Sequence, residues 1–258
     1  SKTGYEVMNM NLGAMHNTPG DVGSYGLLYQ WGRKDPFPAA PTLTGTTATV
    51  GAPIYDGDNN EIKITNSSQS STADNNLAFA IANPTVCLSN YAQFNTSRDW
   101  LQADMSNDAL WGNPKGAERN ETNDFLNKGA KSFYDPCPVG WRVPPADVFR
   151  NFTASGGYAW VIDDFDIADI SGDGAKSLAD YDYGWTFNLS DSASSYFPAA
   201  ARFDGSYAML MGSMSGLWGS YWGNAPYPGD MFQGGAYSVL SFQIKDTAGN
   251  EMITTSPA

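Results

Sequence analysis

Apolar and polar side chains alternate in several short stretches of the chain, which is the pattern of half-buried strands. In residues 5–12, tyrosine, valine, methionine and leucine side chains surround Glu6, Asn9 and Asn11, which predicts an opening strand. Residues 25–31 fit a short helix or a strand. After residue 183 the pattern consists of strands and turns, and we expect strands at residues 185–189, 207–211, 219–222, 237–244 and 251–254.

Helical patterns are short. Residues 144–152 begin with two prolines and are followed by Gly156 and Gly157, as a bounded helix commonly is. We expect this helix to turn its apolar face inward, with Val148, Phe149 and Phe152 buried.

Between these elements, the chain gives weaker signals. Residues 39–76 are rich in Thr, Ser, Asn and Gly, which predicts a loop or hairpin excursion within the domain. Residues 55–60 would close a hairpin there. Residues 77–88 carry mixed signals, and residues 97–110 fit a short helix or a wrapped loop.

Composition narrows the fold class. The 258 residues include 27 Gly and 15 Pro, which indicates many turns and long ordered loops. The 8 Trp, 14 Tyr and 13 Phe supply material for a packed core. We therefore expect one α+β domain over residues 1–258, with small antiparallel sheets and few short helices.

Charge and hydropathy exclude two classes of partner. The formal net charge is −13, and the 14 Lys and Arg residues are spread along the chain, so we expect no nucleic-acid partner. No run of about 18 apolar residues occurs, and we expect no membrane span.

Three unusual segments carry a family resemblance. They are Gly-Leu-Leu-Tyr-Gln-Trp-Gly-Arg-Lys-Asp-Pro-Phe-Pro at residues 26–38, Tyr-Asp-Pro-Cys-Pro-Val-Gly-Trp-Arg-Val-Pro at residues 134–144, and the pair 196–202 and 216–222. In this order they resemble exported Bacteroidetes proteins of the Fibrobacter succinogenes major paralogous type. The resemblance covers most of residues 5–245 and implies a C-type-lectin-like fold, related to that of formylglycine-generating enzymes.

The resemblance also assigns structural roles. Trp141 is expected to be a core anchor whose indole N–H finds a carbonyl, and the same is expected of Trp31. Arg33 and Arg142 are expected to bind carbonyls or carboxylates inside the fold.

The function that the resemblance implies is that of an exported, non-catalytic adhesin or ligand-binding module at the bacterial cell surface, for example at a fimbrial tip. Its partners would be a glycan, a host or bacterial surface protein, or other pilus subunits. Two alternatives stay open: a carbohydrate-active enzyme or sugar-binding component of a polysaccharide-use system, and a structural pilus subunit whose open sheet edge accepts a donor strand.

Aromatic residues crowd among Gly and Pro in residues 214–237, interspersed with amide and carboxylate side chains, as in many recognition sites. Neighbouring strand residues point to opposite faces, so we expect Tyr221 to face outward and Trp222 to enter the core. The predicted ligand-binding residues are Trp218, Tyr221, Asn224, Tyr227, Asp230, Gln233 and Tyr237.

Two further features concern metals and redox state. Residues 169–180 place oxygen side chains at alternate positions around a glycine, which partly matches a calcium loop with Asp169, Ser171, Asp173 and Asp180 as ligands. Calcium is thus a candidate cofactor, and no cofactor is required.

Cys87 and Cys137 are the only cysteines in the sequence. They form either a disulfide, which suits an exported protein, or two buried thiols.

Catalysis has little support in the sequence. His16 is the single histidine, and no nucleophile motif adjoins it. The reactive cysteine pair late in formylglycine-generating enzymes has no counterpart here. We expect no enzyme, although Asp163 with Asp164, or Asp204 with Asp230, are carboxylate pairs of the kind that glycoside hydrolysis uses.

Overall fold

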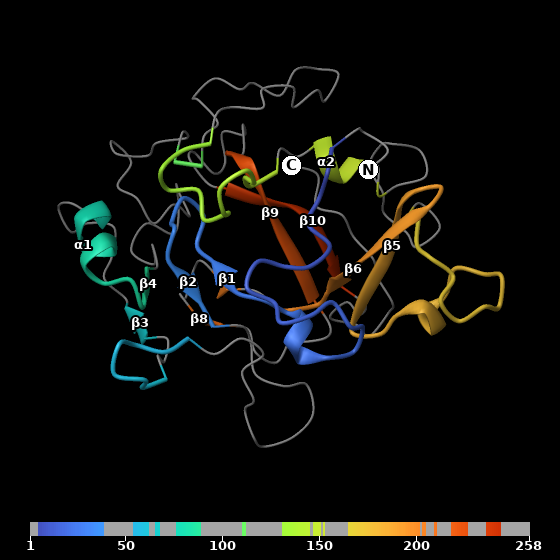
Figure 1. Ribbon diagram of the computed structural model, residues 1–258, viewed down its shortest axis with the longest axis horizontal. Helices are drawn as coiled ribbons and strands as arrows, with labels where there is room; N and C mark the ends of the chain where they lie inside the picture. Colours follow the sequence, from blue (N-terminus) through green and yellow to red (C-terminus); the bar gives the residue numbers. More distant parts are fainter. Residues whose placement is uncertain are drawn as a thin grey trace.

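The computed structural model describes residues 5–38, 54–61, 65–67, 76–88, 110–111, 131–144, 147–150, 152, 165–201, 203–204, 209–210, 218–226 and 236–243 (Figure 1). These residues form a mixed structure with few, short helices and small sheets that are mostly antiparallel. The expected α+β class agrees with this arrangement. Within this part of the chain, no helix is long and apolar enough to span a bilayer.

The described strands associate in pairs. Four pairs are antiparallel: β1 (Leu28–Tyr29) with β2 (Pro36–Phe37), β5 (Gly184–Ser190) with β6 (Ala193–Pro198), β7 (Phe203–Asp204) with β8 (Met209–Leu210), and β9 (Trp218–Pro226) with β10 (Ala236–Gln243). β3 (Thr65–Ser67) pairs with β4 (Val86–Leu88) in parallel. The helical elements are α1 (Asn76–Ala82), α2 (Asp147–Arg150) and two single 3-10 turns, η1 (Val22–Ser24) and η4 (Leu178–Asp180).

One core lies beneath β5 and β6. On β5 the side chains of Trp185, Phe187 and Leu189 are buried, while those between them are partly exposed, as the two-residue period of a strand requires. Phe152 stacks on Phe187 with ring centroids 5.0 Å apart. We call this core the phenylalanine cluster; its buried members are Phe152, Phe165, Ile167, Trp185, Phe187, Leu189, Phe197 and Ala199.

A second core lies under β1, α1 and β4. Trp31 and Trp111 meet there with ring centroids 5.7 Å apart. We call it the tryptophan cluster; its buried members are Trp31, Ala80, Leu88, Leu110, Trp111 and Val143. In Figure 1 the β9–β10 hairpin runs through the middle of the molecule, with β5 and β6 on one side and β1, β2 and α1 on the other.

Several predicted elements are confirmed. β5, β8, β9 and β10 overlap the strands expected after residue 183, and α2 lies within the helix expected at residues 144–152. Val148 and Phe152 are buried as expected, and Phe149 packs against the phenylalanine cluster. The hairpin expected at residues 55–60 is closed by a bridge between Tyr55 and Glu61. The strand expected at residues 251–254 lies outside the described residues.

The strand expected at residues 5–12 is wrong, because this segment is irregular. Asn11 begins a tight turn in which its carbonyl accepts the N–H of Ala14 at 2.9 Å. The Asn11 side chain donates to the carbonyl of Tyr25 at 3.0 Å, and the carbonyl of Leu12 accepts the N–H of Leu27 at 2.9 Å. Side-chain bonds and a turn thus replace a strand ladder, as asparagine commonly allows.

Candidate functional site

β9 carries three of the seven residues expected to bind a ligand, Trp218, Tyr221 and Asn224. The structure places Tyr221 inward, so the expectation that it faces outward is wrong. Its ring meets Phe197 edge-to-face at 5.2 Å and packs against the phenylalanine cluster. Its hydroxyl donates to the carbonyl of Pro198 at 2.7 Å. Burial raises the pKa of this phenol well above its ordinary value.

Trp222 points to the opposite face of β9 and enters the tryptophan cluster, as expected. Its indole N–H donates to the carbonyl of Tyr29 at 2.9 Å, and its ring lies edge-on to Trp111. The indole of Trp31 donates to the carbonyl of Gly223 at 3.3 Å. Trp31 is therefore the buried anchor that the sequence predicted, and it holds β9 from the same side.

The two ends of β9 have different neighbours. Trp218 is half-buried at the first end, where its carbonyl accepts the N–H of Ala201 at 2.9 Å. Asn224, near the other end, is only 1% exposed, and its backbone N–H donates to the carbonyl of Pro144 at 2.9 Å. At roughly 3.3 Å per residue, a strand of this length separates its ends by about 25 Å. Trp218 and Pro226 therefore lie at opposite ends of the strand.

The remaining predicted ligand residues belong to the hairpin connection or to β10. Pro226 pairs with Ala236, so residues 227–235 join the two strands at this end of the hairpin. Tyr227, Asp230 and Gln233 are in that connection and lie outside the described residues. Tyr237 lies on β10, and its side chain is likewise not described.

A compact loop at residues 131–144, called the turn at residues 131–144 below, lies beside the end of β9 that carries Asn224. The carboxylate of Asp135 organises it: one oxygen accepts the N–H of Cys137 at 2.8 Å and the ammonium of Lys131 at 2.9 Å, and the other accepts the N–H of Val143 at 2.9 Å. Asp135 is 1% exposed. A buried carboxylate that bonds two backbone amides and a cation fixes the turn without needing an aromatic anchor.

Trp141 is on the surface, so the expectation that it anchors the core is wrong. It is 37% exposed, and its backbone N–H donates to the carbonyl of Pro138 at 3.0 Å. Phe133 and Val139 on the same turn are 79% and 98% exposed. The sequence signal for this arrangement was Pro-Val-Gly-Trp at residues 138–141, which is a four-residue turn with glycine at positive φ.

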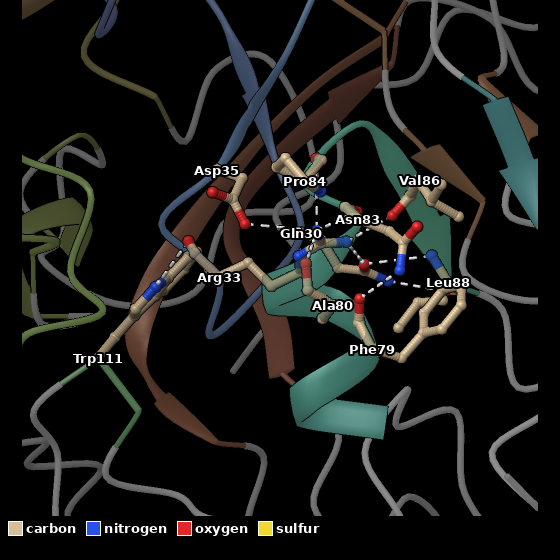
Figure 2. A network of polar contacts seen from close by, with 10 residues as sticks. All are labelled: Gln30, Arg33, Asp35, Phe79, Ala80, Asn83, Pro84, Val86, Leu88 and Trp111. Carbon is tan, nitrogen blue, oxygen red and sulfur yellow. Dashed lines mark hydrogen bonds and ion pairs between the residues drawn. The ribbon is translucent and has the colours of Figure 1, made fainter. Parts of the chain in front are cut away.

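The role expected for Arg33 is confirmed: the guanidinium binds carbonyls inside the fold (Figure 2). It donates to the carbonyls of Val86 at 2.6 Å, Ala80 at 3.2 Å and both Asn83 and Pro84 at 3.3 Å. These carbonyls belong to the end of α1, the following turn and β4, where acceptors lack helical partners. Burial lowers the pKa of Arg33, and the nearby Asp35 carboxylate opposes that shift.

The aspartates expected to bind calcium accept backbone amides of their own loop. Asp169 accepts the N–H groups of Gly172 at 2.7 Å and Gly174 at 2.9 Å. Asp180 accepts those of Ser171 at 3.0 Å and Ser177 at 3.1 Å, and it closes the capping box of η4. Burial alone raises the pKa of Asp180, but these amide bonds hold it below its ordinary value.

In the described residues no three His, Cys, Asp or Glu side chains are grouped so that they could hold a metal ion. Asp173 is exposed and accepts the N–H of Ala175 at 2.8 Å. Calcium binding by this loop stays a prediction.

Cys87 and Cys137 are both free thiols, so the disulfide between them is not formed. Cys87 is buried beside Phe37, and Cys137 is partly buried against the tryptophan cluster. Burial raises the pKa of each thiol to about 12.

Among the groups considered for catalysis, the structure describes the side chain of His16 alone. His16 lies 3.6 Å from the carboxylate of Asp21 and accepts the N–H of Thr18 at 3.4 Å. Asp163, Asp164 and Asp230 lie outside the described residues, and the side chain of Asp204 is not described. Comparisons of the chain with models of protein families, with curated proteins and with solved structures found no match. The functional argument therefore rests on the chain's own residues.

Proposed function

We propose that the protein is an exported, non-catalytic adhesin or ligand-binding module with a C-type-lectin-like α+β fold, presented at a bacterial cell surface. Its ligand is a glycan or a surface protein. The contact residues are those that join β9 to β10, with Tyr227, Asp230 and Gln233 as the side chains that supply an aromatic face and polar groups.

The observation that carries this proposal is the double anchoring of β9. Tyr221 is fixed in the phenylalanine cluster and Trp222 in the tryptophan cluster. The backbone is also held from outside the hairpin at Trp218 by Ala201 and at Asn224 by Pro144. A strand fixed on both faces and along its edge is a rigid base for the residues at its end, and rigid support lowers the entropy cost of binding.

The experiment is binding of the purified chain to an array of glycans and host matrix proteins, with and without added calcium. The variant is Tyr227→Ala combined with Gln233→Ala, and the matched control is Tyr55→Ala, an exposed tyrosine on the hairpin at residues 54–61. We expect selective binding that the double variant weakens by about tenfold or more while its melting temperature is unchanged.

Binding that occurs only with added calcium would show that the cation takes part in it, and loss of that binding in Asp169→Asn would assign the cation to the loop with Asp169 and Asp180. No binding anywhere on the array, or binding that the double variant retains in full, would overturn the proposed site and favour the structural-subunit alternative.

A further inference from the structure

Exposed apolar side chains gather on the turn at residues 131–144. Among the described residues, eight large hydrophobic side chains are exposed, and three of them, Phe133, Val139 and Trp141, belong to this turn. The other five are scattered over separate elements. Single exposed apolar residues are ordinary, whereas three within residues 133–141 make this segment a candidate contact surface. We call these three side chains, with Lys34, the Phe133–Trp141 surface.

The turn that carries this surface is held firmly in place. Lys131 spans it by donating to Asp135 at 2.9 Å and to the carbonyl of Cys137 at 2.7 Å. Ser132 donates to the carbonyl of Leu110, next to Trp111 in the tryptophan cluster. Val143, at the far end, is buried. The exposed rings therefore project from a fixed frame, and a partner that binds them does not have to order the turn.

Positive charge accompanies the apolar side chains. The ammonium of Lys34 lies 4.7 Å from the centroid of the Phe133 ring, which joins residues 31–37 to the turn. In residues 31–37 and 131–143 the charged side chains are four cations and two carboxylates, a net charge of +2 in a chain whose net charge is −13. Both carboxylates already face cations, Asp35 facing Arg33 and Asp135 facing Lys131.

We propose that the Phe133–Trp141 surface binds a partner protein through a patch that is apolar at its centre and acidic at its rim. This inference rests on the proposed function, since it assumes a module that presents binding surfaces, and it adds a second surface whose partner is a protein. Phe133 and Val139 carry no side-chain polar atom, and Val139 offers no ring face, so these side chains suit apolar protein contacts better than sugar hydroxyls. The exposed Lys34 supplies complementary charge for an acidic rim, and Arg142 adds to the net positive charge of these residues.

The test uses a defined probe, a set of immobilised peptides in which leucine and phenylalanine alternate with aspartate and glutamate. A second set has lysine in place of every acid. We expect the full chain to bind the acidic set and to ignore the lysine set, with affinity that falls as salt is raised because exposed charges are screened. Trp141→Ser and Phe133→Ser should each weaken binding about tenfold.

The charge contribution is tested with Lys34→Gln. Its matched control is Ser192→Asp, which changes the net charge by the same amount at the exposed turn between β5 and β6. Tyr55→Ser is the control for loss of an exposed ring. We expect weaker binding for Lys34→Gln and none of that loss in either control, with the melting temperature unchanged in all variants.

Several outcomes overturn the inference. The inference is wrong if the chain binds the acidic and the lysine peptides equally, or if it does not bind the acidic peptides at all. It is also wrong if Trp141→Ser and Phe133→Ser bind the acidic peptides as well as the parent chain does. Binding instead to vesicles containing anionic lipid, or to an acidic polysaccharide, in a manner lost in the same variants would reassign the surface to a membrane or a glycan. The variant Tyr227→Ala with Gln233→Ala separates the two proposals, because it should weaken array binding and leave peptide binding intact.

Discussion

Tyr221 and Trp222 are consecutive residues of β9, and their rings enter different hydrophobic clusters. Tyr221 packs on Phe197 in the phenylalanine cluster, and Trp222 packs on Trp111 in the tryptophan cluster. β9 is therefore covered on both faces and joins the two cores. A slip of one residue along this strand would send each ring to the wrong core, so the strand's register is strongly determined.

Both rings should accordingly contribute to stability. We expect Tyr221→Ala and Trp222→Ala each to lower the free energy of unfolding by about 3–5 kcal/mol, because each removes a large buried ring. Chemical denaturation of the two variants measures this loss. Tyr55→Ala, which removes an exposed ring, should change it by less than about 0.5 kcal/mol. A Tyr221→Ala loss as small as that of the control would show that Tyr221 does face outward.

Trp31 and Trp141 should behave in opposite ways. Trp31 is 5% exposed and donates to the carbonyl of Gly223, whereas Trp141 is 37% exposed. Trp31→Ala should cost about 3–5 kcal/mol of unfolding free energy. Trp141→Ser should leave it within about 0.5 kcal/mol. Chemical and thermal unfolding measure both variants. A loss of stability in Trp141→Ser as large as that in Trp31→Ala would contradict the surface position of Trp141.

Arg33 should not be replaceable by lysine. A single ammonium cannot reach the four carbonyls around the end of α1 that the guanidinium binds, and carbonyls left unpaired in a buried site are costly. We expect Arg33→Lys to lower the unfolding free energy by at least about 2 kcal/mol. Lys34→Gln, at the adjacent exposed position, is the control and should be nearly neutral. Comparable denaturation midpoints for the two variants would contradict this role.

Stability should fall at alkaline pH because of a group of buried phenols. Burial raises the pKa of Tyr25, Tyr181, Tyr196 and Tyr221 well above the ordinary value. In the unfolded chain these phenols ionise near pH 10, whereas the folded chain keeps them protonated. Their contribution to stability is thus fully present below about pH 10 and is lost as pH rises above it.

Denaturation at a series of pH values from about 8 to about 11 measures this loss. Tyr25→Phe removes one ionising group, so its stability should fall less steeply with pH than that of the parent chain. Appearance of tyrosinate absorbance for all tyrosines near pH 10 without unfolding would contradict the burial of these phenols.

The two thiols should be free and slow to react. Because burial raises the pKa of Cys87 and Cys137 to about 12, little thiolate exists near neutral pH. We expect iodoacetamide to leave the folded protein unmodified and to alkylate both cysteines in denaturant. Intact-protein mass spectrometry reads both results. A mass lower by two hydrogens, with no alkylation in denaturant, would show that a disulfide forms after all.

Some features could be predicted from the sequence because local chemistry decides them. The two-residue period of β5 identified its buried face, and the proline and glycine limits of residues 144–157 located α2. The expectation that Arg33 binds carbonyls or carboxylates inside the fold came with the resemblance, and the guanidinium does bind carbonyls. The hairpin at residues 55–60 followed from its Asp, Gly and Asn residues.

Other features depended on partners far away in the chain. The outward expectation for Tyr221 assumed one buried face on β9, but the structure places a core on each. Trp141 was expected inside because large aromatic rings commonly are, yet the buried carboxylate of Asp135 fixes the turn in its place. The Asn11 side chain donates to the carbonyl of Tyr25, a residue distant in the sequence. This bond belongs to an irregular segment in place of the strand expected at residues 5–12.

By itself the sequence determined the α+β class, the periodicity of the later strands and the aromatic material for the cores, since these follow from local propensity and composition. Only the tertiary structure decided which rings are buried, because burial depends on what covers each face. It also decided that Trp218 and Asn224 lie toward different ends of β9, where each is held by a different segment of the chain. The alternation of a strand dictates that neighbouring side chains point to opposite faces. Tertiary packing alone decides which residues each side chain contacts.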